Sequence, residues 1–397
     1  MPRTTAIFRG VHPTALRRIN AIEVFNAVRT KPGLSQKDIV AETGIDRSTV
    51  STIVAQFDAL GLLERGTASS EGRRGRKSET LAIKTDAGLL IGAHIMPEQL
   101  LFVSSGLDGT PAETMALPPL TDAADVEAAI GKGLDTFLYR IGAKPEDVSA
   151  FGLCVPGLVA TGGRLAESSN MSWQDLNLPE ILGGKIPSKF HIDNDSRAAG
   201  IAEKLFGQCV NVDDYIYVDS ASGLGGLLYM NGSPYVGAGG FAGEIGHMKV
   251  VPNGRLCTCG ASGCASAYLS EPALVRRFQR VGLKAETFGE IRALAGSGSE
   301  RALTLLDEAG EMLGLALSDL VNLFNPPVVV LGSGLGLLAD YLLPAAQRTL
   351  ARNALQSPRA LCRIVSSDIA QMDTPRGGLA LALNALTEPS GDSPFPW

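Results

Sequence analysis

Four potential metal ligands stand close together in one short stretch of the sequence. They are His247, Cys257, Cys259 and Cys264. Imidazole nitrogen and thiolate sulfur are donors that tetrahedral Zn²⁺ prefers. Gly254, Gly260 and Gly263 permit the tight turns that would close the stretch around one ion. Because four protein ligands leave no position for a catalytic water, the spacing predicts a structural zinc site. The alternative is three buried cysteines beside a surface histidine.

A second group of polar side chains falls in loops at the ends of predicted strands. The group consists of Asn170, Asn194, Asp195, Glu244 and His247. Carboxylates and carboxamides suit a sugar, because each sugar hydroxyl both donates and accepts a hydrogen bond. Taken singly, each residue type is more often a turn former or a cap, and Asp195 is equally well explained as the N-cap of the next helix. The glycine run at 222–226 is also compatible with a simple hairpin turn.

The charge distribution divides the chain into two unequal parts. Residues 1–84 carry 14 Lys and Arg against 8 Asp and Glu, whereas residues 85–397 carry 21 against 33. A basic segment is suited to phosphate, and an acidic one has no electrostatic reason to bind DNA. The asymmetry predicts an N-terminal nucleic-acid module at 1–84 and an acidic body at 85–397.

The basic segment has the pattern of a helix-turn-helix. Apolar residues at helical spacing predict a first helix at about 15–30, Ser35 is the predicted cap of a second that ends at Gly44, and Asp46 is the predicted cap of a third. The third helix would bury a stripe from Val50 to Leu60 and expose near its N-terminus Arg47, Ser48, Thr49, Ser51 and Thr52. In this motif the second helix of the pair enters the major groove.

A β-hairpin is predicted to follow the helices and to complete a winged helix. Its strands are 62–65 and 79–83, and its tip carries Arg73, Arg74, Arg76 and Lys77 between glycines. Guanidinium groups at such a tip can enter a narrow minor groove, where the negative potential is strongest. The alternative is a solvated charged loop.

The acidic body alternates apolar strands with helical segments, which predicts an α/β fold long enough for two lobes. Strands are expected at 89–93, 100–104, 150–155, 190–192, 215–218, 226–230 and 328–331, and helices at 123–141, 196–206, 271–281 and 302–325. Ligands of such folds usually lie in the crevice outside the strand ends.

No apolar stretch reaches the roughly 18 residues that a membrane helix requires. The N-terminus also lacks the apolar core of a secretory signal, so a cytoplasmic location and no membrane partner are expected. In a reducing compartment the clustered cysteines favour zinc ligation over a disulfide, and Cys154, Cys209 and Cys362 are interpreted as isolated small apolar residues.

These motifs together resemble the repressor, open reading frame, kinase (ROK) family, in its winged-helix transcription-regulator branch. The resemblance rests on Val155-Pro156-Gly157, Asn194-Asp195 with Ala198-Ala199, Gly243-Glu244-Ile245-Gly246-His247, the three clustered cysteines, and Asn325-Pro326-Pro327-Val328 with Leu331-Gly332. It implies a two-lobed actin/hexokinase-like body with a structural zinc, a sugar site between the lobes, and a homodimer or homotetramer. Lobe one would comprise about 85–200 plus the C-terminal helix, and lobe two about 201–379.

The resemblance places Asn170, Asn194, Asp195, Glu244 and His247 at the sugar, with His247 shared between sugar and metal. Asp195 matches the base of family kinases. Glucose-binding members commonly carry a glutamate where this chain has Ser266, which leaves the identity of the sugar open.

The phosphate loop of family kinases is degenerate here. Its Asp-x-Gly-x-Thr positions align with His94, Met96 and Glu98, with Pro97 between them. A methionine side chain, an added carboxylate and a missing N–H all oppose the approach of ATP phosphates. The second kinase loop, at 221–225, is only mildly altered.

The expected function is a sugar-responsive transcriptional regulator, a repressor of carbohydrate metabolism genes that binds double-stranded operator DNA and a sugar effector and lacks efficient kinase activity. The main alternative is an active ATP-dependent sugar kinase with an attached DNA-binding module. A third hypothesis is a regulator whose cleft binds no ligand and whose control comes from a protein partner.

Overall fold

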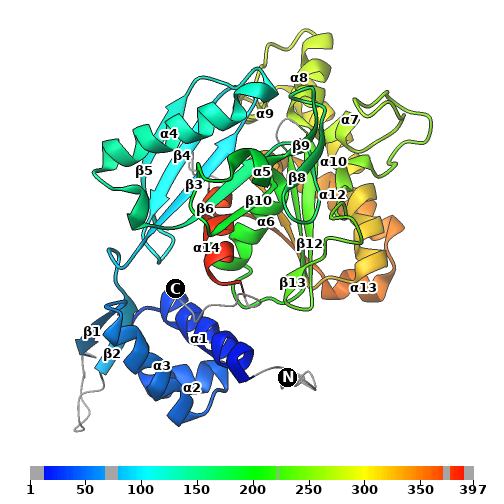
Figure 1. The fold of residues 1–397 in the computed structure, drawn as a ribbon. Coiled ribbons are helices and arrows are strands. Elements are labelled where there is room, and N and C mark those ends of the chain that lie inside the picture. Colours follow the sequence, from blue (N-terminus) through cyan, green and yellow to red (C-terminus); the bar gives the residue numbers. More distant parts are fainter. Residues whose placement is uncertain (1–12, 68–78, 221–222, 370–375, 389–397) are drawn as a thin grey trace.

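The protein is described by a computed structural model that covers residues 13–67, 79–220, 223–369 and 376–388 (Figure 1). A small N-terminal unit, blue in Figure 1, lies at one end of a larger body that is built around two five-stranded sheets. The predicted fold class, a winged helix-turn-helix followed by a two-lobed α/β body, is confirmed.

In its described residues, the N-terminal unit contains three helices and one antiparallel pair of strands. Its elements are α1 (Pro13–Thr30), α2 (Gln36–Thr43), α3 (Arg47–Ala59), β1 (Leu63–Thr67) and β2 (Glu79–Ile83). Ser35 and Asp38 form a capping box at the start of α2, and Gly44 ends that helix with a left-handed φ of 71°. Asp46 caps α3 by accepting a hydrogen bond from the Thr49 N–H at 3.0 Å. The predicted helix starts at Ser35 and Asp46 are confirmed.

One residue of the predicted buried stripe of α3 is exposed. Val50, Ile53, Val54 and Phe57 are buried as predicted, but Leu60 is 49% exposed. The helix ends at residue 59, and the chain turns away at Gly61 with a φ of 71°. Leu60 therefore leaves the helical face on which the spacing had placed it.

Lobe one surrounds the sheet whose strand order is β10-β6-β3-β4-β5. Its elements are β3 (Leu89–Ile95), β4 (Leu100–Ser105), β5 (Pro111–Leu117), η1 (Ala123–Asp125), α4 (Val126–Ile141), η2 (Pro145–Asp147), β6 (Val148–Val155), β7 (Leu158–Val159), β8 (Arg164–Ser168), β9 (Trp173–Asn177), α5 (Leu178–Leu182) and β10 (Phe190–Asn194). The strands β3, β6 and β10 are parallel, so their carboxyl ends meet at one edge. Strands β7, β8 and β9 form a separate small sheet that the sequence did not predict.

Lobe two surrounds the sheet whose order is β13-β12-β11-β14-β15. Its elements, with the last helix, are α6 (Asp195–Phe206), β11 (Tyr215–Ser220), β12 (Leu224–Met230), β13 (Ser233–Pro234), η3 (Ile245–His247), α7 (Ser266–Leu269), α8 (Glu271–Arg280), α9 (Phe288–Gly296), α10 (Glu300–Phe324), β14 (Val328–Leu331), α11 (Ser333–Leu337), α12 (Ala339–Asn353), α13 (Gln356–Leu361), β15 (Arg363–Ser366) and α14 (Arg376–Leu386). Helices α10 and α12 pack on each other and supply much of this lobe's apolar core.

Helices α6 and α14 lie side by side between the two sheets (Figure 1). Helix α14, red in Figure 1, packs on β3, β6 and β10 and so joins lobe one, although it is the last helix described. Glycines make this approach close, because a Cβ on Gly152 would lie 2.0 Å from the carbonyl oxygen of Gly378. None of the helices in the described ranges combines the length and apolar character needed to cross a bilayer.

Candidate functional site

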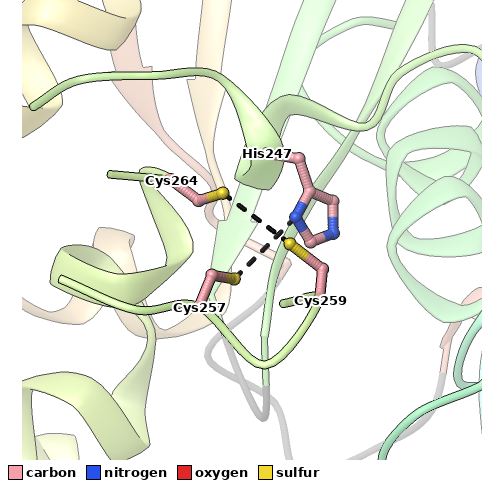
Figure 2. Close-up of side chains that lie close together, drawn as sticks. All are labelled: His247, Cys257, Cys259 and Cys264. Carbon is pink, nitrogen blue, oxygen red and sulfur yellow. Dashed lines mark hydrogen bonds between the residues drawn. The ribbon is translucent and has the colours of Figure 1, made fainter. Parts of the chain in front are cut away.

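The four predicted metal ligands converge in the structure (Figure 2). The ligand atoms of His247, Cys257, Cys259 and Cys264 all lie within 4.8 Å of one another. The Sγ atoms of Cys259 and Cys264 are 3.8 Å apart, and Nδ1 of His247 is 3.9 Å from Sγ of Cys257. A tetrahedral Zn²⁺ with its usual bond lengths requires ligand separations of about 3.6–3.8 Å. The chemistry and the spacing of these side chains therefore fit a metal ion such as zinc.

The backbone of the cysteine loop folds back on itself through glycines. Gly260 and Gly263 have left-handed φ angles of 85° and 80°, and a Cβ on Gly263 would lie 1.9 Å from the Val251 carbonyl oxygen. Gly254 is required for a different reason, because a Cβ there would meet the Tyr268 hydroxyl at 2.1 Å. Two of the three predicted glycine turns are thus left-handed, and the third is a close contact.

A lysine lies against the metal ligands. Lys249 Nζ donates a hydrogen bond to Sγ of Cys264 at 2.8 Å. Three thiolates and one neutral imidazole around Zn²⁺ would carry a net charge of −1, which an ammonium group offsets. The sequence analysis did not single out Lys249, although its place two residues after His247 was visible.

A cavity of about 510 Å³ lies beside the metal ligands. All six residues predicted to bind the sugar line it: Asn170, Asn194, Asp195, Glu244, His247 and Ser266. Its volume is within the range of small-molecule sites. The structure thus brings the predicted residues together from four separate segments of the chain, and their role in binding stays a prediction.

Asn194 has two functions at the start of α6. Its Oδ1 accepts hydrogen bonds from the N–H groups of Ser196 and Arg197 at 3.0 and 3.1 Å, and its Nδ2 donates to the Gly157 carbonyl at 2.9 Å. Asn194, and not Asp195, is therefore the N-cap of this helix. Asp195 occupies the first helical position, where its Oδ1 also accepts a hydrogen bond from the Ser196 N–H at 2.8 Å.

Burial and neighbouring charges shift the pKa values of the carboxyl groups in the cavity. Burial raises the pKa of Asp195, and the nearby His94 opposes this. Burial also lowers the pKa of His94, which Asp195 and Glu98 counteract. Burial raises the pKa of Glu244; Arg197 opposes it, and Asp195 adds to it. Hydroxyl groups of a ligand would stabilise both carboxylates by replacing the water that burial removes.

A buried arginine of α6 joins three segments of the chain next to residues that line the cavity. Arg197 is 5% exposed; its Nε donates to Asp193 at 2.8 Å, and its Nη2 donates to the Val159 carbonyl at 2.7 Å. It also donates to the carbonyl of Gly240. Sequence reasoning missed this residue, although a charged side chain within Asp-Asn-Asp-Ser-Arg was the available signal.

The cavity is also lined by two charged residues that the sequence did not indicate. Glu167 comes from β8, in the small sheet, and Arg276 from α8. Both side chains belong to exposed residues. The three carboxylates of the lining, at 167, 195 and 244, give the cavity a negative character that Arg276 offsets in part.

The two loops that resemble kinase phosphate loops have different structures. Residues 96–99 form a tight turn between β3 and β4, in which the Met96 N–H donates to the Gln99 carbonyl at 2.9 Å. In the second loop, Gly223 and the glycines that follow line the cavity. A Cβ on Gly225 would lie 2.3 Å from Ser196 Oγ, so packing against α6 accounts for this glycine. Residues 221–222 lie outside the described residues.

The predicted DNA-reading residues of α3 are largely exposed. Arg47, Ser48, Ser51 and Thr52 face solvent, whereas Thr49 is half-buried and donates its hydroxyl to the capping Asp46. Hydrogen bonds from Ser48 and Thr49 lower the pKa of Asp46, which keeps the cap ionised. The wing residues Arg73, Arg74, Arg76 and Lys77 lie outside the described residues.

Matches to known proteins cover both parts of the chain. Residues 109–385 match the ROK family, and residues 16–75 match the MarR family. The chain is 28% identical to the xylose repressor of Bacillus subtilis strain 168 over 324 residues, which are 80% of this chain and 83% of that protein.

Two solved structures have the same fold. A ROK family transcriptional regulator, described as a homologue of the Escherichia coli MLC protein, is 23% identical; the match covers 94% of this chain and 98% of that one, with a TM-score of 0.79. A ROK family glucokinase from Streptomyces griseus, in complex with glucose and AMPPNP, is 25% identical over 74% of this chain and 98% of its own, with a TM-score of 0.64.

The glucokinase matches about the length of the body alone, whereas the regulator matches nearly the whole chain including the winged helix. The family match itself extends over more than half of the sequence and contains the metal ligands, the cavity residues and nearly all of α14. The chain belongs to the ROK family.

Proposed function

We propose that this protein is a sugar-responsive, DNA-binding transcriptional regulator that represses genes of carbohydrate metabolism. Its winged helix binds double-stranded operator DNA, and a sugar in the 510 Å³ cavity changes the affinity for that DNA. The observation that carries the proposal is the combination, in one chain, of an exposed helix-turn-helix face and a cavity lined by every residue predicted to bind the sugar. The relationship to a xylose repressor supports it.

Sugar recognition would use groups that both accept and donate hydrogen bonds. Asn194 has its carboxamide at the cavity, and Asp195 and Glu244 offer carboxylate oxygens. Ser266 stands where family members that bind glucose carry a glutamate. The shorter, neutral side chain leaves more space at this position, so the effector need not be glucose.

We propose that the metal is structural zinc, bound by His247, Cys257, Cys259 and Cys264. With all four positions filled by protein, the ion stabilises the loop and fixes the ring of His247 at the cavity wall. The metal would thereby orient one of the groups that contact the sugar.

We propose that the protein lacks efficient kinase activity because the loop at 94–98 is altered. Phosphoryl transfer depends on positioning and on neutralisation of phosphate charge. Met96 and Pro97 stand where the kinase loop approaches phosphate, and Glu98 adds a negative charge.

We propose that the DNA-binding domain comprises residues 1–84 and the sugar-binding body residues 85–397. We also propose a homodimer or homotetramer, because paired half-sites require two winged helices.

A screen of sugars against the full chain tests the proposal. Pentoses, hexoses, amino sugars and sugar phosphates would be screened by thermal shift, because a ligand that binds only the folded state at 100 times its Kd adds about 2.7 kcal/mol of stability. The hit should lose its effect in Glu244→Gln and keep it in Glu146→Gln, a control at an exposed position outside the cavity. Genomic fragments selected by the protein would then be tested for release by the same sugar.

A kinase remains the second candidate because Asp195 occupies the position of the family base and its pKa is raised. ADP release would be measured with the sugar that gives the thermal shift. Turnover that disappears in Asp195→Asn would favour the kinase. Sugar binding and operator release without turnover would favour the regulator, and operator binding without any sugar response would favour control by a protein partner.

A further inference from the structure

Helix α6 extends from the cavity to the DNA-binding unit. Its first turn carries Asn194 and Asp195, which line the cavity. Its last residues, Leu205 and Phe206, contact α1 of the winged helix. The helix has 12 residues, so at 1.5 Å per residue it spans about 18 Å. Helix α6 therefore contacts both the cavity proposed to bind the sugar and the unit proposed to bind DNA.

Arg29 makes the contact between α1 and the end of α6. It is 7% exposed, its Nη1 donates to the Leu205 carbonyl at 3.1 Å, and its guanidinium lies 5.4 Å from the centre of the Phe206 ring. Burial lowers its pKa to about 10, and the charge of Asp108 opposes this. A buried guanidinium is costly unless its donors are satisfied, so this contact depends on the exact position of the helix end.

A second arginine of α1 contacts α14, the neighbour of α6. Arg18 is 5% exposed, and its Nε and Nη2 donate to the carbonyls of Glu388 and Leu386 at 2.7 and 3.4 Å. Leu386 shares an apolar core with Val24 and other residues of α1. In Figure 1 α1 lies at the lower ends of α6 and α14, so a shift of this pair would move the surface on which α1 packs.

The structure of α6 favours movement as one piece. Its residues Ala198, Gly200, Ile201 and Ala202 are buried between α14 and the second sheet. Packed elements of this kind shift between discrete arrangements and do not bend continuously. A ligand that changes the hydrogen bonds of Asn194 would act on the first turn, and the last turn would follow.

We propose that α6 transmits the state of the cavity to the winged helix, with Arg29 as the positioning residue that couples the two. This inference rests on the proposed function for the identity of the ligand and of the DNA. The coupling between α6 and α1 is a property of the protein without either of them. Occupation of the cavity changes the placement of α1 through Leu205 and Phe206, and the winged helix turns with α1.

Hydrogen exchange in the full chain, without sugar or DNA, tests the coupling. Asn194→Ala removes the cap of α6, and we expect about fivefold faster exchange of the amides of residues 26–30 in α1, the factor expected for a lost cap. Asn194→Ser keeps a capping oxygen and should restore slow exchange. In an Arg29→Met background, which keeps the apolar packing, Asn194→Ala should leave residues 26–30 unchanged. Arg17→Met, an exposed arginine of the same helix, is the matched control and should preserve the coupling.

Three outcomes would overturn the proposal. Residues 26–30 would exchange no faster in Asn194→Ala, or they would exchange faster by the same factor in the Arg29→Met background. An equal increase in the exchange rate of amides in α10 would also contradict the proposal, because such an increase reports global opening of the protein. A failed sugar screen refutes the proposed function and leaves this measurement unaffected, so the two failures are distinguishable.

Discussion

Two glycines of the segment 223–226 have different surroundings, and they provide a matched pair of substitutions. A Cβ on Gly226 would lie 2.3 Å from the carbonyl oxygen of Tyr217 and 2.5 Å from Cδ1 of Ile245. A Cβ on Gly223 would meet no heavy atom within 4 Å. The backbone carbonyl of Tyr217 cannot rotate aside, so Gly226→Ala must move β12 relative to β11, its antiparallel partner.

The expected cost follows from this contact. Forcing an extra carbon into a packed region typically costs about 1–3 kcal/mol. Each kcal/mol shifts the melting temperature of a domain of this size by about 2–4 °C, so Gly226→Ala should melt about 2–12 °C lower. Gly223→Ala adds a methyl group to open space at an ordinary φ, so its effect should stay within about 0.5 kcal/mol.

Thermal unfolding of both variants beside the unmodified chain measures the difference. Equal melting temperatures for the two variants would refute the packing explanation of the glycine loop. A larger loss for Gly223→Ala would refute it as well, since no steric contact accounts for such a loss. The expected result means that strand packing requires Gly226, so the presence of this glycine is not evidence of nucleotide binding.

Three further predictions concern the metal, the DNA and the cavity carboxylates. Cys264→Ser should lose bound zinc in metal analysis and melt at a lower temperature, whereas Cys362→Ser, outside the cluster, should keep one zinc per chain. Arg47→Ala should weaken operator binding and flatten the slope of log Kd against log salt by about 1, and Arg352→Ala, exposed on the body, should change neither. Because the folded-state pKa of Glu244 is raised, the folded state binds the proton more tightly, so stability falls as pH rises above the ordinary value of 4.5. Urea unfolding should therefore show that Glu244→Gln gains stability over the unmodified chain between pH 4 and 7, and a difference independent of pH would contradict the assignment.

The sequence was most informative where local chemistry decides the structure. Ser35, Gly44 and Asp46 mark helix boundaries through contacts within a few residues, and the structure has those boundaries. The strands at 89–93 and 150–155 were predicted because their sequences are apolar, as suits strands buried on both faces, and the structure extends them to 89–95 and 148–155. The six cavity residues and the four metal ligands were identified from the resemblance and from spacing.

Features that depend on distant contacts were not predicted. Strand β5 lies at a sheet edge with mostly exposed residues, so it has no continuous apolar pattern. Arg197 is buried because Val159 and Gly240, about 40 residues away on either side, supply acceptors. Glu167 and Arg276 reach the cavity from two different lobes, and no local pattern records that encounter.

The cavity and the altered phosphate loop can be compared with what an enzyme and a regulator each require of a ligand site. An enzyme must stabilise its transition state more than its substrate, which needs a loop that neutralises charge on the transferred phosphoryl group. A regulator needs only a difference in ligand affinity between two conformations. Asn194 satisfies that need directly, because the carboxamide that lines the cavity is also the cap of α6. A ligand that competes for this carboxamide would act on the helix, so under the proposed function sugar recognition and conformational coupling would share one side chain.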